Sequence, residues 1–270
     1  MKTSELINLN DKAKRELITG LDIGKYLNRI EFKGTKEPTI KNLFLLQDTH
    51  NKNVPYENLD IMNNIRISLE IPDIYDKIVN RKRGGYCFEL NGIFGWLLRS
   101  LGYDVNDYFA RYLRDEPEIP MRRHRVLLVS CENETFLCDV GIGSAVPLLP
   151  IKFLLNEPQP QNKDIYRLIF DDFLGYVLEE FRHDEWLPLF SFTTEKQLNK
   201  DFLATHWYCE THPDSCFRAM NLVSMRTDTG RKILEDKTFK IFVNENVTVF
   251  TVENQDDFNE NLKKLFNIEL

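Results

Sequence analysis

Residues 83–91 read RGGYCFELN: an arginine and two glycines lead to Cys87, which begins an apolar segment. From Cys87 to Leu101 apolar residues recur at spacings of three and four, and Gly102 follows, which is the pattern of a helix and its end. We therefore predict Cys87 in the first turn of a helix, where unpaired N–H groups and the helix dipole favour a thiolate. Arg83 is close enough in sequence to add a positive charge. The alternative is that Cys87 is a small buried hydrophobic residue, as most free cysteines are.

The composition is that of an ordinary globular protein. A chain of 270 residues with 42% hydrophobic residues can bury a large core. Its net charge is −7 and its basic clusters, residues 81–83 and 122–125, are short, so we expect no nucleic-acid partner. The longest apolar runs are far too short to span a bilayer, so we expect no membrane partner either.

The cysteines indicate a reducing compartment. There are five, an odd number without a C-x-x-C pair, and the first residues contain no apolar signal segment. We therefore expect a cytoplasmic protein without a disulfide framework. One local cluster, His206, Cys209, His212 and Cys216, offers four metal ligands. Structural zinc sites separate their ligand pairs by about a dozen residues or more, so we expect a turn here and no metal.

Helical and strand-like patterns are segregated along the chain. The first hundred residues carry helix-spaced apolar positions, with a well-marked helix after Pro38 and Thr39. After Gly102 the pattern changes to alternation rich in β-branched and aromatic residues. The expected strands are residues 103–113, 124–130, 135–140, 166–170, 176–181, 186–190, 217–225, 239–243 and 247–252, and a last helix is expected over residues 256–265. This order indicates an α+β fold built from separate parts.

Two of these strands bring a histidine close to an aspartate. If the hairpin over residues 124–140 turns at Glu132 and Asn133, Val126 faces Asp139 on the neighbouring strand. His124 and Asp139 then emerge on the same face as diagonal neighbours. A register slip of one residue would place them on opposite faces.

Cys87, His124 and Asp139 form a candidate catalytic triad. A cysteine attacks an acyl carbonyl as a thiolate and therefore needs a base. The imidazole in turn needs a carboxylate that holds its tautomer and stabilises the imidazolium. Because the chain has five cysteines and five histidines, such a set can also be assembled by chance.

The motif at residues 83–91 resembles the nucleophile motif of the arylamine N-acetyltransferases. His124 falls where that family has its catalytic histidine. Other segments are similar to further family motifs: PYENLD at residues 55–60, LGYDV at 101–105, DVGIG at 139–143 and HPDSCF at 212–217. The resemblance covers about residues 20 to 260.

The resemblance implies a three-part α+β fold with a papain-like Cys-His-Asp triad. Its parts are a helical bundle with the nucleophile, a β-barrel with the histidine and the aspartate, and an α/β lid. They are expected over residues 1–102, 103–205 and 206–270.

The resemblance further implies a ping-pong acetyl transfer of the kind used in xenobiotic metabolism. Acetyl-coenzyme A is the acyl-donor substrate, and Cys87 carries the acetyl group as a thioester. An arylamine, arylhydrazine or N-hydroxyarylamine then takes the acetyl group. His124 acts as the base, Asp139 orients it, and the backbone N–H of Cys87 donates to the oxyanion.

Coenzyme A is expected to contact two segments of the chain. The implied contacts are Gly141, Gly143, Ser144 and Ser224. No P-loop or dinucleotide-type glycine loop is present in the sequence, so these contacts rest on the resemblance alone. Arg122 and Arg123 depart from common members of the family, and we hypothesise that they meet the phosphates of coenzyme A; the alternative is that they are solvated surface arginines. A second departure is an extension of about twenty residues before Tyr26, to which no role is assigned.

Other activities fit the same triad. A cysteine amidase or thioesterase would use water as the acceptor, and an amide synthase of the same superfamily would close an amide within a carrier-bound chain. A protein that only binds coenzyme A or an aromatic ligand is a further alternative. The sequence determines neither the acceptor nor the oligomeric state.

Overall fold

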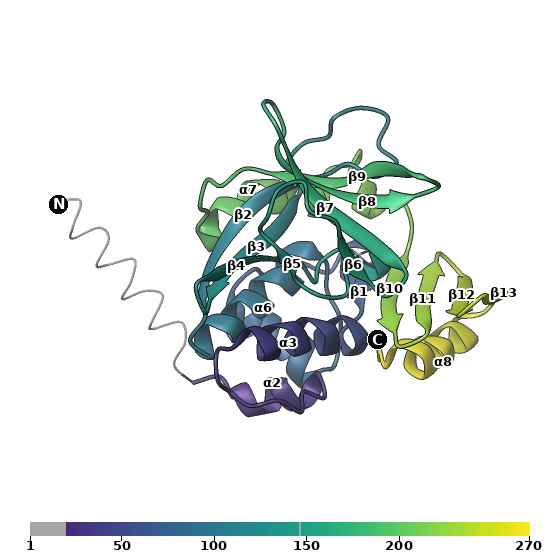
Figure 1. The fold of residues 1–270 in the computed structure, drawn as a ribbon. Coiled ribbons are helices and arrows are strands. Elements are labelled where there is room, and N and C mark those ends of the chain that lie inside the picture. Colours follow the sequence, from purple (N-terminus) through teal and green to yellow (C-terminus); the bar gives the residue numbers. More distant parts are fainter. Residues whose placement is uncertain (1–19, 146) are drawn as a thin grey trace.

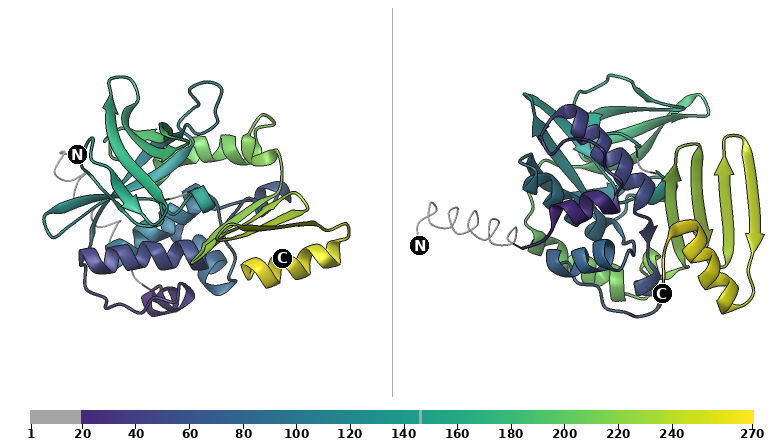
Figure 2. Two further views of the ribbon diagram at one scale, coloured as in Figure 1. Left: turned by 45° about the vertical axis from the view of Figure 1, so that its right-hand side comes forward. Right: turned by 90° about the horizontal axis from the view of Figure 1, so that it is seen from below.

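The computed structural model of the protein describes residues 20–145 and 147–270 (Figure 1). The helices of the first hundred residues lie together below a curled sheet, and a smaller sheet with the last helix lies beside both (Figures 1 and 2). This is the three-part α+β architecture that the sequence predicts. Of the short helices that the sequence predicts over residues 6–30, one is found at Ile23–Arg29, and residues 1–19 lie outside the described residues.

The first part of the described chain is mainly helical. Its helices are α2 (Ile23–Arg29), α3 (Ile40–Asn53), α4 (Leu59–Met62), α5 (Ile71–Tyr75), the π-helix η1 (Asp76–Asn80) and α6 (Cys87–Ser100). α3 begins as predicted after Thr39, whose hydroxyl accepts a hydrogen bond from the Asn42 N–H at 3.2 Å. α6 begins at Cys87, and Gly102 follows it at φ +94°, as predicted. Among the described residues, no helix combines the length and the apolar character needed to cross a bilayer.

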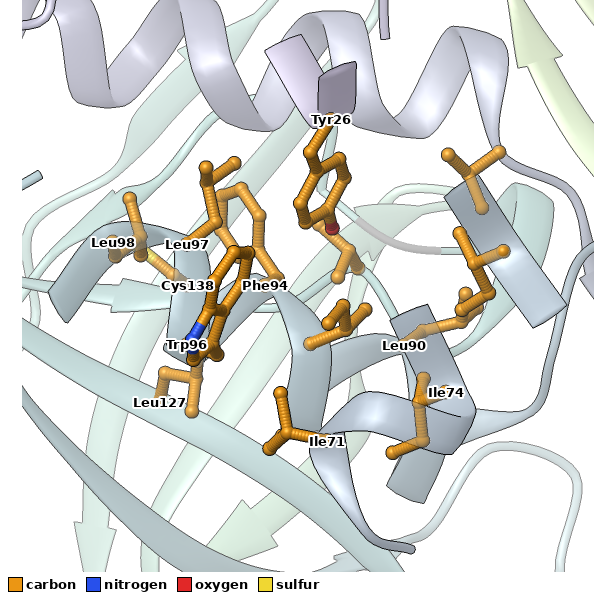
Figure 3. Packing of buried hydrophobic residues seen from close by; sticks show 14 of the residues in the cluster. Tyr26, Ile71, Ile74, Leu90, Phe94, Trp96, Leu97, Leu98, Leu127 and Cys138 are labelled. Carbon is orange, nitrogen blue, oxygen red and sulfur yellow. The ribbon is translucent and has the colours of Figure 1, made fainter. Parts of the chain in front are cut away.

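Helix α6 lies at the centre of the hydrophobic core. Its residues from Cys87 to Leu98 are all buried, as expected of a helix that is enclosed by other elements. Figure 3 shows Trp96 of α6 facing Tyr26 of α2, with the two rings stacked at 6.3 Å between centroids. Tyr75 meets the same indole edge-on at 5.7 Å. The helix that begins with Cys87 is therefore held by packing from several elements.

Strands form the second part. They are β2 (Asp104–Tyr112), β3 (His124–Cys131), β4 (Glu134–Cys138), β5 (Ile151–Lys152), β6 (Gln159–Gln161), β7 (Asp164–Asp171), β8 (Gly175–Arg182) and β9 (Glu185–Phe192). They make one antiparallel sheet in the order β5-β4-β3-β2-β9-β8-β7-β6, which curls into a barrel (Figure 2).

The β3–β4 hairpin has the predicted register. Leu127 pairs with Cys138, so residue 126 lies opposite residue 139. Glu132 and Asn133 form the turn with positive φ angles of 50° and 62°, which is the two-residue turn that suits the twist of a hairpin. His124 and Asp139 consequently emerge on the same face.

Two glutamines join the two ends of this sheet. The side-chain amide of Gln161 exchanges hydrogen bonds of 2.8 and 2.9 Å with the backbone of Leu149. Gln159 makes the same pair of bonds, at 2.8 and 2.9 Å, with the backbone of Lys152 on β5. Pro160 between them lacks an N–H group, which suits a strand at the end of a sheet. Side chains here take the place of a backbone ladder and close the barrel.

The third part begins with helical turns and ends with a small sheet covered by one helix. Its elements are η3 (Asn199–Phe202), α7 (Leu203–Thr211), η4 (Cys216–Arg218), β10 (Leu222–Thr227), β11 (Gly230–Glu235), β12 (Thr238–Val243), β13 (Asn246–Thr251) and α8 (Gln255–Phe266). The short strand β1 (Tyr56–Glu57), from the helical part, pairs with β10 and completes the sheet. α8 packs on one face of this sheet through Phe258 and Leu262, which contact Leu234 and Phe239 in one apolar cluster.

Three expectations from the sequence differ from the structure. The strand expected over residues 217–225 begins only at Leu222, because residues 216–218 form the 3-10 turn η4. Strand β11 is not expected from the sequence, since the charged residues of GRKILE obscure the alternation of apolar and polar residues that marks a strand. β1 is a two-residue strand that only its partner β10 defines, so the first hundred residues are not wholly helical.

A buried cluster of charges connects β1, α4, η1 and α6. The Arg83 guanidinium donates to both carboxylate oxygens of Glu57 and to Asp60, each at 2.8 Å. Lys77 bonds Asp60 at 2.7 Å and Glu89 at 2.8 Å. Burial by itself would lower the pKa of Lys77, but Glu89, Glu57 and Asp60 outweigh it and raise that pKa above its usual value. Lys77 is therefore held as a cation.

The same carboxylates hold the backbone of the loop before α6. Glu57 accepts the Gly84 N–H at 3.1 Å, and Glu89 accepts the Tyr86 N–H at 3.1 Å. A Cβ at Gly84 would lie 2.1 Å from the carbonyl oxygen of Pro55, so only glycine allows this approach. The motif residues around Cys87 thus fix the path of the loop.

We expect Lys77→Met to lower the free energy of unfolding by about 3–5 kcal/mol, because it leaves Asp60 and Glu89 buried without their shared cation. Urea unfolding followed by circular dichroism measures this. The control is Arg81→Met, which removes an exposed ion pair with Asp76 and should cost less than about 1 kcal/mol. Equal losses in the two variants would contradict a special role for the buried cluster.

Candidate active site

A cavity of about 280 Å³ opens where the three parts meet. Cys87 at the start of α6, His124 at the start of β3 and Gly141 after β4 line it from the helical part and the barrel. Tyr56 of β1 and Ser224 of β10 line it from the small sheet. Two members of the predicted triad therefore face one cavity.

The third member, Asp139, binds the histidine from behind this wall. His124 Nε2 and Asp139 Oδ2 are 2.7 Å apart, and each side chain is only 2% exposed. His124 Nδ1 has no hydrogen-bond partner among the described residues. When Nε2 donates its proton to Asp139, the lone pair lies on Nδ1, which is the atom that can take a proton.

Asn91 positions the carboxylate, a role that no prediction from the sequence assigns to it. Its amide donates to Asp139 Oδ1 at 2.8 Å and to the Arg125 carbonyl at 2.6 Å, and its oxygen accepts the Val140 N–H at 3.0 Å. The signal was present, because Asn91 ends the quoted motif and lies one helical turn after Cys87. Gln47 of α3 adds a bond of 3.3 Å to the Asp139 N–H, which no local pattern indicates.

Arg125 joins the same strand to the helix that carries the cysteine. It is buried, forms an ion pair with Asp107 at 2.7 Å and places its guanidinium over the ring of Phe202 at 4.6 Å. It also donates to the Phe88 carbonyl at 3.4 Å. The barrel strand and α6 are thereby fixed to each other beside the cavity.

The environment of Cys87 differs in part from the prediction. Burial, with Cys209 and Asp139 as smaller causes, raises the pKa of the Cys87 thiol well above its usual value. Backbone N–H groups of Phe88 and Arg125 oppose this rise only partly. Arg83 supplies no compensating charge, because Glu57 and Asp60 bind its guanidinium. A thiolate at Cys87 therefore requires a nearby base that takes the proton.

The residues predicted to contact coenzyme A fall into two groups. Gly141 and Ser224 line the cavity, whereas Gly143 and Ser144 lie in the 3-10 turn η2 (Gly143–Ala145) and contact Ser224. The Ser144 N–H donates to the Ser224 hydroxyl at 3.1 Å. A Cβ at Gly143, which has φ +59°, would lie 1.9 Å from that hydroxyl. A Cβ at Gly141 would lie 2.9 Å from the Cys87 Cα, so a glycine is needed beside Cys87.

Other candidate ligands from the sequence have partners of their own. Arg123 lines the cavity, and its guanidinium bonds Glu116, which lines it too. Both ring nitrogens of His206 are engaged, Nδ1 with the Tyr86 hydroxyl and Nε2 with the Ile67 carbonyl at 3.0 Å. His206 thus links α7 to Tyr86 and Ile67 through hydrogen bonds, which leaves neither ring nitrogen free to bind a metal.

The sequence has close relatives of known activity. The sequence profile of the N-acetyltransferase family matches residues 39–270. An arylamine N-acetyltransferase of Mycobacterium tuberculosis strain H37Rv is 35% identical over 217 residues, which are 78% of this chain and 76% of the relative. One from Escherichia coli K12 is 33% identical over 214 residues, 78% of this chain and 75% of the relative.

Solved structures agree with the sequence relatives. The arylamine N-acetyltransferase of M. tuberculosis superposes with a TM-score of 0.85 at 31% identity, covering 92% of this chain and 93% of that one. The enzyme of Mycobacterium marinum in complex with CoA has a TM-score of 0.83 at 30% identity over 92% of this chain and 93% of that one. The match of the family profile, the relatives and the fold leads to one conclusion: the chain belongs to the arylamine N-acetyltransferase family.

Proposed function

We propose that this protein transfers an acetyl group from acetyl-coenzyme A to an aromatic amine, hydrazine or hydroxylamine through a thioester on Cys87. The observation that carries the proposal is the pair formed by His124 and Asp139. Asp139 Oδ2 is hydrogen-bonded to His124 Nε2 at 2.7 Å. His124 Nδ1 has no hydrogen-bond partner among the described residues, and His124 lines the same cavity as Cys87. The CoA complex of the M. marinum relative supports the acyl donor.

In the first half-reaction His124 removes the proton of the Cys87 thiol. This step makes the thiolate accessible despite the raised pKa of Cys87, because the proton stays within the site and Asp139 stabilises the imidazolium. The thiolate attacks the acetyl carbonyl, and the backbone N–H at the start of α6 stabilises the oxyanion. The bond between the acetyl carbon and the coenzyme A sulfur then breaks, and His124 gives its proton to that sulfur.

In the second half-reaction the acceptor attacks the thioester. A C–N bond forms, or a C–O bond with an N-hydroxyarylamine, and the bond from the acetyl carbon to Cys87 breaks. His124 takes the proton that the acceptor loses and returns it to the Cys87 sulfur. The free enzyme is thereby restored.

We propose that four residues form or shape the contact with coenzyme A. We propose that Gly141 and Ser224 touch the bound thioester, because both line the cavity. We propose that Gly143 and Ser144 shape this contact through the Ser224 hydroxyl, to which both lie close. Because the Arg123 guanidinium is paired with Glu116, we expect Arg123 to stabilise the cavity wall and not to bind the phosphates of coenzyme A.

The cellular setting that we propose is the cytoplasm. All five cysteines are free, including the nucleophile, which suits a reducing compartment.

A hydrolase with the same triad is the main alternative activity. It would release coenzyme A from acetyl-coenzyme A at its full rate without an amine. For a transferase we expect steady release only when an aromatic amine is present, preceded by one equivalent of acetyl-enzyme. Measuring coenzyme A release with and without the amine separates the two.

We expect Cys87→Ala to abolish acetyl transfer and the mass increase of one acetyl group on mixing with acetyl-coenzyme A. Peptide mapping of the wild type should place the acetyl group on Cys87 and not on Cys216, the other cysteine that lines the cavity. Asp139→Asn should lower kcat by about a thousandfold or more, because the imidazole loses its orienting carboxylate. Near-normal turnover by Cys87→Ala would exclude the mechanism.

We expect Asn91→Ala to lower kcat about tenfold or more with little change in KM for acetyl-coenzyme A. It removes a hydrogen bond to the charged Asp139, and such bonds contribute about 1.5–3 kcal/mol. The pH profile of Cys87 alkylation by iodoacetamide should shift as well, which a merely structural loss would not cause. Asn261→Ala, which removes a bond to the Asp257 carbonyl within α8, is the matched control and should leave both measurements unchanged.

A further inference from the structure

A second pocket lies on the other side of the small sheet from the catalytic cavity. Neighbouring residues of β10 face the two spaces: Ser224 lines the catalytic cavity and Met225 lines the second pocket. Figure 1 shows this region where one end of α3 approaches β10 and the C-terminus of the chain. The pocket has a volume of about 380 Å³.

Positive charge is concentrated in this pocket although the chain as a whole carries a net charge of −7. One acidic residue, Glu31, lines it. One wall belongs to the helical part and the other to the small sheet and α8. The basic residues that line the pocket come from both walls: Arg29, Lys52, Lys82, Lys232 and Lys264. Like charges gathered in a recess repel one another and raise the local concentration of anions.

Two of these cations form hydrogen bonds with backbone carbonyl groups. Arg29 donates to three backbone carbonyls, those of Asn53, of Ile78 at 3.1 Å and of Lys82 at 3.4 Å. Lys232 donates to the carbonyl of Leu265, in the last turn of α8, at 2.9 Å. Burial lowers the pKa of both side chains, and at Arg29 the nearby Tyr26 and Glu31 oppose this only partly.

The remaining cations differ in their pairing. Lys52 is bound by Asp48 at 2.9 Å and Asp228 at 2.8 Å, so its charge is balanced. Neither Lys82 nor Lys264 forms an ion pair within residues 20–145 and 147–270. Their ammonium groups are therefore available to a ligand.

The backbone that presents Lys82 is held in a specific conformation. Lys82 has φ +56°, and the neighbouring Arg83 N–H bonds the Lys77 carbonyl at 3.0 Å. The Arg83 side chain is fixed by the buried cluster, and Arg29 holds the Lys82 carbonyl. The pocket is thus largely pre-formed, which reduces the entropic cost of binding a ligand.

We propose that this pocket binds the diphosphate group of a small ligand, with Lys82 and Lys264 contacting it from opposite walls and Arg29 and Lys232 supplying charge behind them. A diphosphate fits because it carries several negative charges and many acceptor oxygens, while the pocket offers several cations and one carboxylate. This site is separate from the catalytic cavity, and the proposal does not depend on the acetyl transfer.

The test uses the full-length protein and inorganic pyrophosphate as the probe, in buffer without divalent metal and at matched ionic strength with sodium chloride. Calorimetry should show saturable binding of one pyrophosphate per chain, and the melting temperature should rise with pyrophosphate and not with chloride. A parallel titration with ADP distinguishes the sources of the group. Equal affinities support recognition of the diphosphate alone, and tighter binding of ADP supports a nucleotide ligand.

The variant Lys82→Gln/Lys264→Gln should weaken pyrophosphate binding by about tenfold for each lysine, because each loses a charge-assisted hydrogen bond. The matched control is Lys263→Gln, which removes the neighbouring lysine of α8 that pairs with Glu269 and does not line the pocket. Melting without ligand reports whether each variant is folded. Arg123→Gln, in the catalytic cavity, should leave the affinity for pyrophosphate unchanged.

Three results would overturn the proposal. The first is that pyrophosphate and ADP bind no better than chloride at the same ionic strength. The second is that the double lysine variant, folded by its melting curve, keeps the wild-type affinity. The third is that Arg123→Gln weakens binding while the lysine variant does not, which would place the anion in the catalytic cavity.

Discussion

Five buried charges, Glu57, Asp60, Lys77, Arg83 and Glu89, carry the constraint on which the site depends. The loop before α6 has little regular structure of its own, and its N–H groups and arginine are held by these carboxylates. Buried ion pairs add little net stability, since desolvation offsets their attraction, but they tolerate few alternative arrangements. Their effect here is to place the first turn of α6 at one position, with Cys87 as its first residue.

The second constraint comes from the barrel. His124 and Asp139 are set on one face by the hairpin register, and Asn91 of α6 reaches across to the carboxylate. The buried side chain of Arg125 ties the same strand to the helix. Cys87 and His124 therefore belong to different parts of the fold, yet their separation is controlled by contacts between rigid elements. A preorganised site of this kind needs little rearrangement when charge develops.

The small C-terminal sheet takes part in both recesses of the molecule. Through β1 and β10 it completes the wall of the catalytic cavity, and α8 covers its other face. Where α8 ends, the basic pocket opens beside α3. Lys82 of that pocket directly precedes Arg83 of the buried cluster, so the cluster also holds the loop that presents Lys82. Burial also affects the electrostatics of the cavity, because it disfavours the thiolate of Cys87.

The start of α6 at Cys87, its end near Gly102 and the register that joins His124 to Asp139 can all be predicted from the sequence, because helical spacing and strand alternation are local patterns. Family motifs added the three-part fold. Three features depend on tertiary contacts: Arg83 binds Glu57 and Asp60 and not Cys87, β1 pairs with β10, and Asn91 and Gln47 bind Asp139. Each of these contacts joins residues far apart in sequence, and partners of that kind are chosen by packing and by the need to pair buried polar groups. The basic pocket has the same origin, since its cations come from five separate segments that no local pattern connects.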